Sequence, residues 1–138
     1  KDVLGFRATQ MNELDQAKAC FNFTVGSPER MELYSPHYPK KYPNNTDCIK
    51  KIEAPYGYYV ELDFRDDFHL EEASNCEYDY LEILDGPYGY SNLLGRYCGA
   101  TFPPLTQSSG RYLWLKFHSD DSIEYVGFRA VFKFFPIE

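Results

Sequence analysis

Strict alternation of apolar and polar side chains is the feature that most limits what this chain can fold into. Residues 59–65 place Val60, Leu62 and Phe64 on one side of an extended chain and charged residues on the other. A period of two is the signature of an antiparallel strand with one buried face. Residues 111–117 and 128–134 repeat this alternation. The sequence therefore predicts at least three half-buried strands.

Shorter apolar runs between turn residues predict further strands at 31–34, 48–54, 80–84 and 93–97. Aromatic residues make up 18% of the chain, with 13 Tyr and 11 Phe, and such residues favour strands. Proline-rich loops are expected at 35–43 and 101–110. Only residues 11–19 are compatible with a short helix. Many short strands with frequent turns predict an all-β sandwich.

The length of 138 residues is typical of one domain with an ordinary core. A net charge of −7 and a pI near 4.9 argue against binding to nucleic acid or to an anionic membrane surface. Cations or a basic protein surface are the expected partners. No run of 18 apolar residues is present, so we expect a mature ectodomain fragment that does not itself insert into a membrane.

The cysteines and the glycosylation motifs indicate an extracellular protein. Four cysteines without a CxxC motif fit two disulfide bonds in an oxidising compartment better than a zinc site. Asn22-Phe23-Thr24 and Asn44-Asn45-Thr46 are acceptor motifs for N-linked glycans. We therefore predict glycosylation of Asn22 and Asn44.

The stretch from Leu70 to Asp85 concentrates carboxylates. Four of them, Glu71, Glu72, Glu77 and Asp79, lie within nine residues. Ionised carboxylates at such spacing repel one another, and Ca²⁺, which takes six to eight oxygen ligands, would relieve the repulsion. The alternative from these residues alone is a solvated acidic loop.

Several motifs together resemble the CUB domain family over roughly residues 20–135. Both cysteine pairs fit the family in order and spacing. The motifs are Ser35-Pro36-His37-Tyr38-Pro39-Lys40-Lys41-Tyr42-Pro43, Cys76-Glu77-Tyr78-Asp79-Tyr80, Asp85-Gly86, Gly95-Arg96-Tyr97-Cys98-Gly99 and Gly127-Phe128. The resemblance implies a jelly-roll-like sandwich of two antiparallel sheets, with Cys20 bonded to Cys48 and Cys76 bonded to Cys98. We expect a leader or linker over residues 1–19 and a CUB domain over 20–138.

Many CUB domains bind Ca²⁺ through one tyrosine, one glutamate and two aspartates. The positions that match this pattern are Glu71, Asp79 and Asp120 as ligands and Tyr42 as support. Backbone carbonyls of Ser122 and Ile123 would complete the coordination. Asn is common in the family where Ile123 stands, a departure that matters little if only the carbonyl binds.

Within the family, the chain is most similar to the neuropilin-and-tolloid-like (Neto) proteins. The residues that carry this likeness are Asp85-Gly86-Pro87-Tyr88-Gly89-Tyr90-Ser91, Gly95-Arg96-Tyr97-Cys98-Gly99 and the run from Ser108 to Phe117. Neto proteins are synaptic membrane-anchored auxiliary subunits, so the resemblance implies an ionotropic glutamate receptor ectodomain as partner. The alternatives are an accessory CUB domain of a secreted tolloid- or complement-type protease and a purely structural spacer.

Two surfaces are candidates for the partner contact. Asp121 and Glu124 would extend an acidic rim beside Asp120, while Tyr112 and Trp114 offer an aromatic face. An enzyme is not expected, because His37, His69 and His118 lie in separate segments and lack a nucleophile signature.

Overall fold

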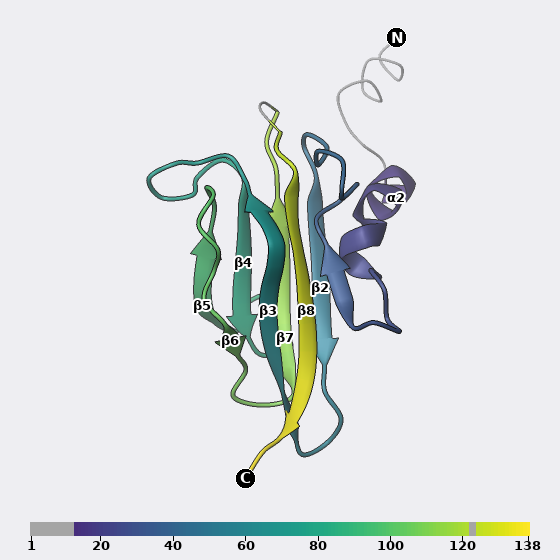
Figure 1. The fold of residues 1–138 in the computed structure, drawn as a ribbon, viewed down its shortest axis with the longest axis vertical. Coiled ribbons are helices and arrows are strands. Elements are labelled where there is room, and N and C mark those ends of the chain that lie inside the picture. Colours follow the sequence, from purple (N-terminus) through teal and green to yellow (C-terminus); the bar gives the residue numbers. More distant parts are fainter. Residues whose placement is uncertain (1–12, 122–123) are drawn as a thin grey trace.

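A computed structural model describes residues 13–121 and 124–138 of the chain. One helix and eight strands follow one another in these ranges (Figure 1). Their bounds are α2 Glu13–Thr24, β1 Glu32–Tyr34, β2 Asp47–Glu53, β3 Tyr58–His69, β4 Tyr80–Asp85, β5 Asn92–Tyr97, β6 Thr106–Gln107, β7 Tyr112–His118 and β8 Gly127–Pro136.

The strands form two four-stranded antiparallel sheets that face each other. One sheet has the order β1-β8-β3-β6 and the other the order β2-β7-β4-β5. The predicted all-β sandwich of two antiparallel sheets is therefore confirmed. Sequence neighbours are often not spatial neighbours, since β8 pairs with both β1 and β3.

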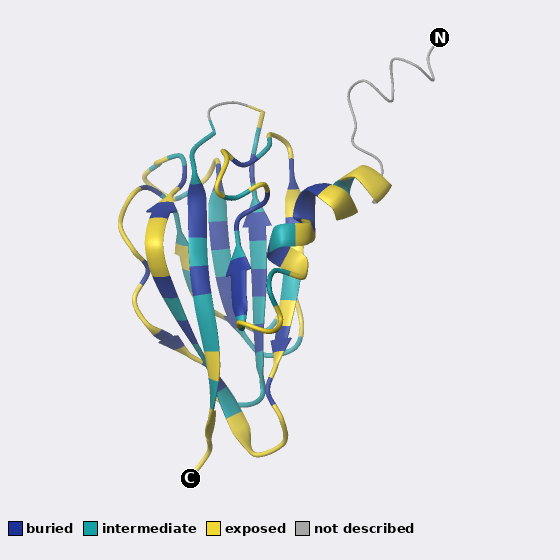
Figure 2. Cartoon of the chain, turned by 45° about the vertical axis from the view of Figure 1, so that its right-hand side comes forward, coloured by how far each residue is buried: buried dark blue, intermediate teal, exposed yellow. Residues whose placement is uncertain are grey.

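Alternation along each strand explains why the sheets pack on each other. Val60, Leu62 and Phe64 of β3 are buried, whereas Arg65 is exposed. On β7, Leu113, Leu115 and Phe117 are fully buried, and the residues between them reach the opposite side of the sheet. Figure 2 shows this as buried and partly exposed residues alternating along the strands.

Phe128, near the start of β8, is the aromatic centre of the core. Its ring lies 5.9 Å from the rings of Phe23, Phe64 and Phe117 and 5.8 Å from that of Phe68 (centroid to centroid). These rings come from the helix and from both sheets. Phe128 therefore joins three elements that are distant in sequence.

The helix is longer than the sequence predicts. We expected a helix over 11–19; α2 runs from Glu13 to Thr24, while Met11 and Asn12 lie outside the described residues. The continuation is stabilised by tertiary contacts, because Phe23 is fully buried in the core and Cys20 forms a disulfide with Cys48 of β2. The helix crosses residue 20 without a break, and the domain boundary at that position remains a prediction.

Lys50 of β2 supplies a cation to the end of α2. Its ammonium donates a hydrogen bond of 2.8 Å to the carbonyl of Thr24, the last residue of the helix. A positive charge at a helix C-terminus interacts favourably with the helix dipole. This contact and the disulfide together attach the helix to the sheet that contains β2.

The loop expected at 101–110 contains one short strand. β6 pairs Thr106 and Gln107 with Leu62 and Glu61 of β3. Two residues are too few to give a period in the sequence, so the pairing was not predicted. Among the described residues, no helix has the length and apolar character needed to cross a membrane.

Replacing Phe128 by alanine removes the ring that joins the helix and both sheets. We expect a loss of about 3–5 kcal/mol in the free energy of unfolding, as for other buried Phe to Ala changes. Urea denaturation followed by fluorescence measures it. Phe135→Ala on the same strand, where the side chain is 36% exposed, is the control and should cost much less. Equal losses for the two variants would contradict the central role of Phe128.

Candidate metal centre

Three strand ends bring the predicted acidic residues to one end of the sandwich. Asp79 directly precedes β4 and Asp120 follows β7 by two residues. In the β4–β7 pair, Tyr80 lies opposite His118, so the antiparallel register places the two aspartates next to each other. Glu71 follows β3, two residues after its last residue, His69.

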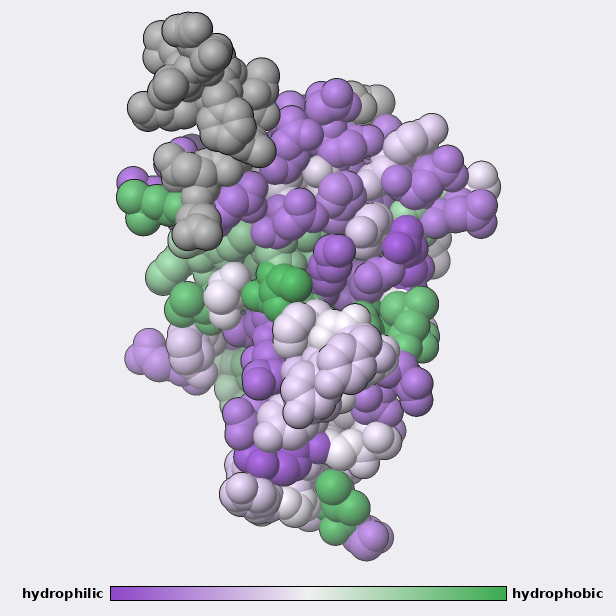
Figure 3. All heavy atoms as spheres, turned by 180° about the vertical axis from the view of Figure 1, so that it is seen from behind, coloured by the Kyte–Doolittle hydropathy of each residue, from purple (hydrophilic) through white to green (hydrophobic). Residues whose placement is uncertain are grey.

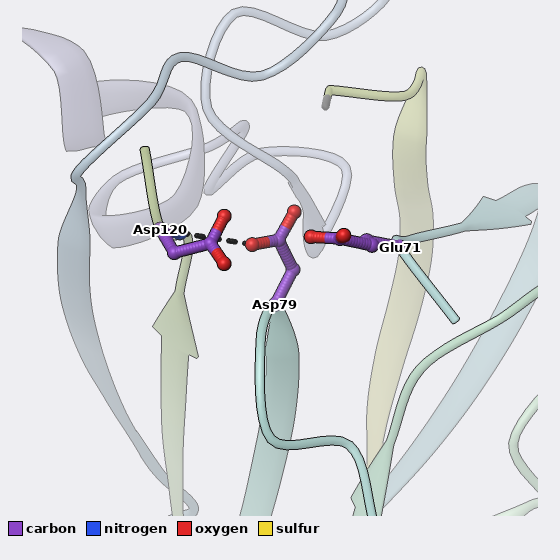
Figure 4. A group of neighbouring side chains, drawn as sticks. All are labelled: Glu71, Asp79 and Asp120. Carbon is purple, nitrogen blue, oxygen red and sulfur yellow. Dashed lines mark hydrogen bonds between the residues drawn. The ribbon is translucent and has the colours of Figure 1, made fainter. Parts of the chain in front are cut away.

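The side chains of Glu71, Asp79 and Asp120 point toward one another (Figure 4). One carboxylate oxygen from each lies within 4.8 Å of the others. Asp79 is fully buried, and its Oδ1 accepts a hydrogen bond of 2.9 Å from the backbone N–H of Asp120. The resemblance to CUB domains thus selected three residues that the fold does bring together.

Tyr42 connects this cluster to the core. Its ring packs edge-on against Phe117 at 5.2 Å, and only 1% of the residue is exposed. Its hydroxyl donates to Asp79 Oδ2 at 2.5 Å and accepts from the N–H of Glu71 at 3.2 Å. Tyr42 therefore fixes the carboxylate of Asp79 directly and holds Glu71 through the backbone N–H of Glu71.

The cluster is electrostatically unfavourable without a cation. Burial, then the charges of Asp120, Asp79 and Asp121, raise the pKa of Glu71. Burial also raises the pKa of Asp79, although its hydrogen bonds from Tyr42 and from the backbone of Asp120 act in the opposite direction. The buried Oε1 of Glu71 has no hydrogen-bond partner among the described residues. An orphaned buried oxygen beside two further acids is the arrangement that a cation would satisfy.

The donor set fits Ca²⁺. Calcium binds oxygen ligands at about 2.3–2.6 Å, so two ligands on opposite sides of one ion lie about 5 Å apart. The carboxylate oxygens of Glu71, Asp79 and Asp120 fall within that limit. Because Ca²⁺ takes six to eight oxygen ligands, three carboxylates leave further coordination positions for backbone carbonyls or water. The cluster has no soft ligand that would favour zinc or copper.

The loop between Glu71 and Asp79 is held in place by contacts with the end of β5. Cys76 is bonded to Cys98, and Arg96 donates a hydrogen bond to the carbonyl of Cys76 at 3.1 Å. At the start of the loop, the N–H of Leu70 bonds to the carbonyl of Gly99 at 3.0 Å. Two of the three acids are therefore positioned by the protein itself.

Sequence reasoning missed the polar residues that hold Asp120. Ser119 is 1% exposed, and its hydroxyl donates to the carbonyl of Pro43 and accepts from the N–H of Thr46. The N–H of Asn45 donates to the carbonyl of Asp120 at 2.8 Å. A serine beside a predicted ligand was visible in the sequence, but nothing in the sequence indicated the loop that it contacts.

The other predicted site residues are either outside the cluster of Glu71, Asp79 and Asp120 or outside the described residues. Ser122 and Ile123 lie outside the described residues, while Asp121 is exposed and Glu124 is half-buried. Tyr112 and Trp114 are half-buried on the outer face of β7, and Tyr112 begins the strand at the end opposite to the cluster. Their role in partner binding remains a prediction.

The two predicted glycosylation sites differ in exposure. Asn44 is exposed, next to the Asn45 that contacts the Asp120 loop. Asn22 is half-buried within α2, where its amide donates to the carbonyl of Tyr38 at 3.1 Å. Glycosylation at either residue remains a prediction.

Known proteins with similar sequences share the CUB domain. The sequence pattern of the CUB domain family matches residues 24–132. Human neuropilin and tolloid-like protein 2 is 46% identical over 102 residues, which are 74% of this chain and 19% of that protein. Mouse tolloid-like protein 2 is 44% identical over 101 residues, or 73% of this chain and 10% of that protein. The chain thus spans less than a fifth of the length of these relatives.

A solved structure that contains Ca²⁺ shares the fold of this chain. The CUB2 domain of MASP-1, determined bound to Ca²⁺, superimposes with a TM-score of 0.68 at 32% sequence identity. The match covers 80% of this chain and 95% of that domain. CUB domains mediate protein interactions, are not themselves catalytic and, when disulfide-bonded, are typical of extracellular proteins. The family pattern, the relatives and the fold together show that this chain belongs to the CUB domain family.

Proposed function

We propose that this CUB domain is an extracellular interaction module whose Glu71, Asp79 and Asp120 bind Ca²⁺ beside the surface that meets a partner protein. The observation that carries the proposal is the buried Glu71 Oε1, which lacks a hydrogen-bond partner among the described residues and lies beside two further acids. When bound, Ca²⁺ would neutralise the cluster and hold its three loops together, with carbonyls of Ser122 and Ile123 as further ligands.

The acidic residues around the cluster suit a basic side chain of the partner. Carboxylates that bind an ion through one lone pair keep others for a Lys or Arg of the partner, in a charge-assisted hydrogen bond. Exposed Asp121, whose charge acts on Glu71, and half-buried Glu124 would extend the same negative surface. The net charge of −7 attracts a basic surface at long range as well.

The similarity to Neto proteins supports a synaptic, membrane-anchored protein as the source of this domain. Identity of 46% to neuropilin and tolloid-like protein 2 is the relevant observation. The proposed partner is then an ionotropic glutamate receptor ectodomain with an exposed basic residue, and the full-length protein would act as an auxiliary subunit rather than as an enzyme.

The second candidate is an accessory domain of a secreted tolloid- or complement-type protease. It is favoured by the 44% identity to mouse tolloid-like protein 2. In that case the same acidic surface would bind a substrate or an assembly partner. A pull-down from synaptic membranes, with and without EDTA, separates the two candidates, because only the first predicts Ca²⁺-dependent recovery of a glutamate receptor.

Calcium should stabilise the fold. Ligand at 100 times its dissociation constant adds about 2.7 kcal/mol to the free energy of unfolding. Differential scanning calorimetry should show the melting temperature rising with Ca²⁺ and returning with EDTA. Asp120→Ala should abolish the response, whereas Glu53→Ala, which removes a carboxylate at the far end of β2, should retain it. A parent melting curve insensitive to Ca²⁺ would rule out the site.

Without Ca²⁺, stability should depend on the protonation of Glu71. Burial and neighbouring charges raise the pKa of Glu71 in the folded protein above its value in the unfolded chain. The contribution of Glu71 to stability is therefore fully present at pH values below the pKa of the unfolded chain. It is lost as the pH rises through the pKa of the folded protein. In EDTA at pH 7, the Glu71→Gln variant should therefore be more stable than the parent, and the difference should shrink as the pH falls to 5. Urea denaturation at several pH values measures this. A parent that is more stable than Glu71→Gln at pH 7 in EDTA would refute it.

Partner binding should depend on the acidic rim. The Asp121→Asn/Glu124→Gln double variant should keep the Ca²⁺-induced rise in melting temperature but bind the receptor ectodomain about tenfold or more weakly, since charge-assisted contacts contribute more than 1 kcal/mol each. Surface plasmon resonance measures the affinity, with Glu53→Gln as control and added salt as a test of screening. Loss of binding in Tyr112→Ala or Trp114→Ala instead would place the interface on the aromatic face.

A further inference from the structure

Four residues on the outer face of the sheet β2-β7-β4-β5 contact one another in a row that crosses all four strands. The guanidinium carbon of Arg96, on β5, lies 4.0 Å from the ring centroid of Tyr80, on β4. The Tyr80 ring stacks on the imidazole of His118, on β7, with the centroids 5.0 Å apart. His118 Nδ1 in turn lies 2.6 Å from Oδ1 of Asp47, on β2. We call Arg96, Tyr80, His118 and Asp47 the outer ladder.

The pairing of the strands explains why the outer ladder forms. Tyr80 is the direct cross-strand partner of His118, and His118 is also that of Asp47. Side chains of such pairs lie on the same face of a sheet at contact distance. Arg96 is paired with Glu82, which lies two residues after Tyr80 on the same face of β4. Glu82 Oε2 accepts hydrogen bonds from Nε of Arg96 at 2.9 Å and from Nη2 at 2.6 Å, so the guanidinium is held over the Tyr80 ring.

The outer ladder crosses the sheet at the end where the candidate metal centre lies. Tyr80 directly follows Asp79 in the chain, and His118 precedes Asp120 by two residues. β4 begins and β7 ends at the upper end of the molecule in Figure 1. Figure 3, which shows the molecule from behind, has hydrophilic residues gathered over that upper end. The outer ladder therefore lies beside two of the three acids.

The two ends of the outer ladder are connected to segments that hold the acids in place. Asp47 follows Thr46, whose carbonyl accepts from the N–H of Ser119 at 2.9 Å and whose N–H donates to the Ser119 hydroxyl at 3.1 Å. At the other end, Nη1 of Arg96 donates to the carbonyl of Cys76 at 3.1 Å. Cys76 belongs to the loop between Glu71 and Asp79, and Ser119 precedes Asp120. Each loop that carries an acid is thus attached to a member of the ladder.

Repulsion between the acids makes such support necessary. Carboxylate oxygens of Glu71, Asp79 and Asp120 lie within 4.8 Å of one another, and their negative charges favour separation of the loops. On the core side of the sheet, Tyr42 opposes this separation through its hydrogen bond to Asp79. On the outer side, ring stacking and the cation over the Tyr80 ring hold neighbouring strand ends together.

We propose that the outer ladder positions the acids of the candidate metal centre and thereby sets its affinity for Ca²⁺. The inference rests on the proposed function, in which Glu71, Asp79 and Asp120 bind Ca²⁺. The ladder side chains are not members of the described acidic cluster, so they are positioning residues and not ligands. Loss of the contacts that orient metal ligands lowers metal affinity by about 10–100-fold.

Isothermal titration calorimetry with calcium chloride tests the role of Arg96. Arg96→Lys keeps the positive charge, so a change in affinity reports geometry and not the loss of a cation beside the site. The variant loses the planar group that stacks on Tyr80 and forms paired bonds with Glu82. We expect it to bind Ca²⁺ about tenfold or more weakly than the parent.

Arg111→Lys is the matched control. Arg111 makes the same kinds of contact at the opposite end of the sheet, just before β7 begins. Its guanidinium carbon lies 3.9 Å from the ring centroid of Tyr56, and it donates to Glu53 at 2.7 Å and to the carbonyl of Ala54 at 2.9 Å. The control should bind Ca²⁺ like the parent. Melting of Arg96→Lys and Arg111→Lys in EDTA measures the loss of stability that both changes cause without Ca²⁺.

Variants of Tyr80 test whether the outer ladder acts as a unit. Tyr80→Phe keeps the ring and should keep the affinity of the parent. Tyr80→Ala removes the ring between Arg96 and His118 and should weaken Ca²⁺ binding about as much as Arg96→Lys. An unchanged affinity in Tyr80→Ala would show that Arg96 acts through Cys76 alone, which would overturn the ladder.

The same titrations separate this inference from the proposed function. If Arg96→Lys binds Ca²⁺ as tightly as the parent, or if Arg111→Lys loses as much affinity as Arg96→Lys, the positioning role is wrong while the calcium site stands. A parent that does not bind Ca²⁺ would overturn both.

Discussion

The hydrogen bond from Tyr42 to Asp79 joins the apolar core to the acidic end of the sandwich. A carboxylate that is fully buried at the end of a hydrophobic core needs donors, and this one has the Tyr42 hydroxyl and the backbone N–H of Asp120. Because the Tyr42 ring packs on Phe117, the position of Asp79 follows from the packing of the core. The packing of the two sheets thereby fixes a side chain of the candidate metal centre.

The loops that carry the other acids of the candidate metal centre are also positioned by contacts that do not involve a cation. The disulfide between Cys76 and Cys98 holds the loop that carries Glu71 and Asp79. The loop that carries Asp120 is bonded to residues 43–46 through Ser119 and Asn45. Such a site is largely formed without a ligand, so little of the free energy of Ca²⁺ binding would be spent on ordering the chain. The cost of this arrangement is the burial of Glu71 and its repulsion by the neighbouring carboxylates, which together raise the pKa of Glu71.

The sandwich could be predicted from the sequence because burial on one face of a strand imposes a period of two, which Val60, Leu62 and Phe64 display directly. The full extent of α2 could not, because its last turn is held by Phe23 in the core and by Lys50 of β2, and both contacts are tertiary. The acidic stretch from Leu70 to Asp85 contains only two of the three residues in the cluster. Glu72 and Glu77 are close to Glu71 in sequence but not part of the described cluster, whose third member, Asp120, is supplied by another strand end. Only the family motif identified that residue, since sequence proximity alone says little about which loops meet.

The distance in sequence between Asp79 and Asp120 has a consequence for the rates of folding and unfolding. The two residues come together only when β4 has paired with β7, with residue 80 opposite residue 118. A ligand that requires this pairing binds late on the folding pathway and contributes little to the transition state. The bound ligand would then stabilise the native state mainly by slowing unfolding, while the folding rate would change little. For a domain outside the cell, where an unfolded chain is exposed to proteases, a long lifetime of the native state is the property that such a ligand would extend.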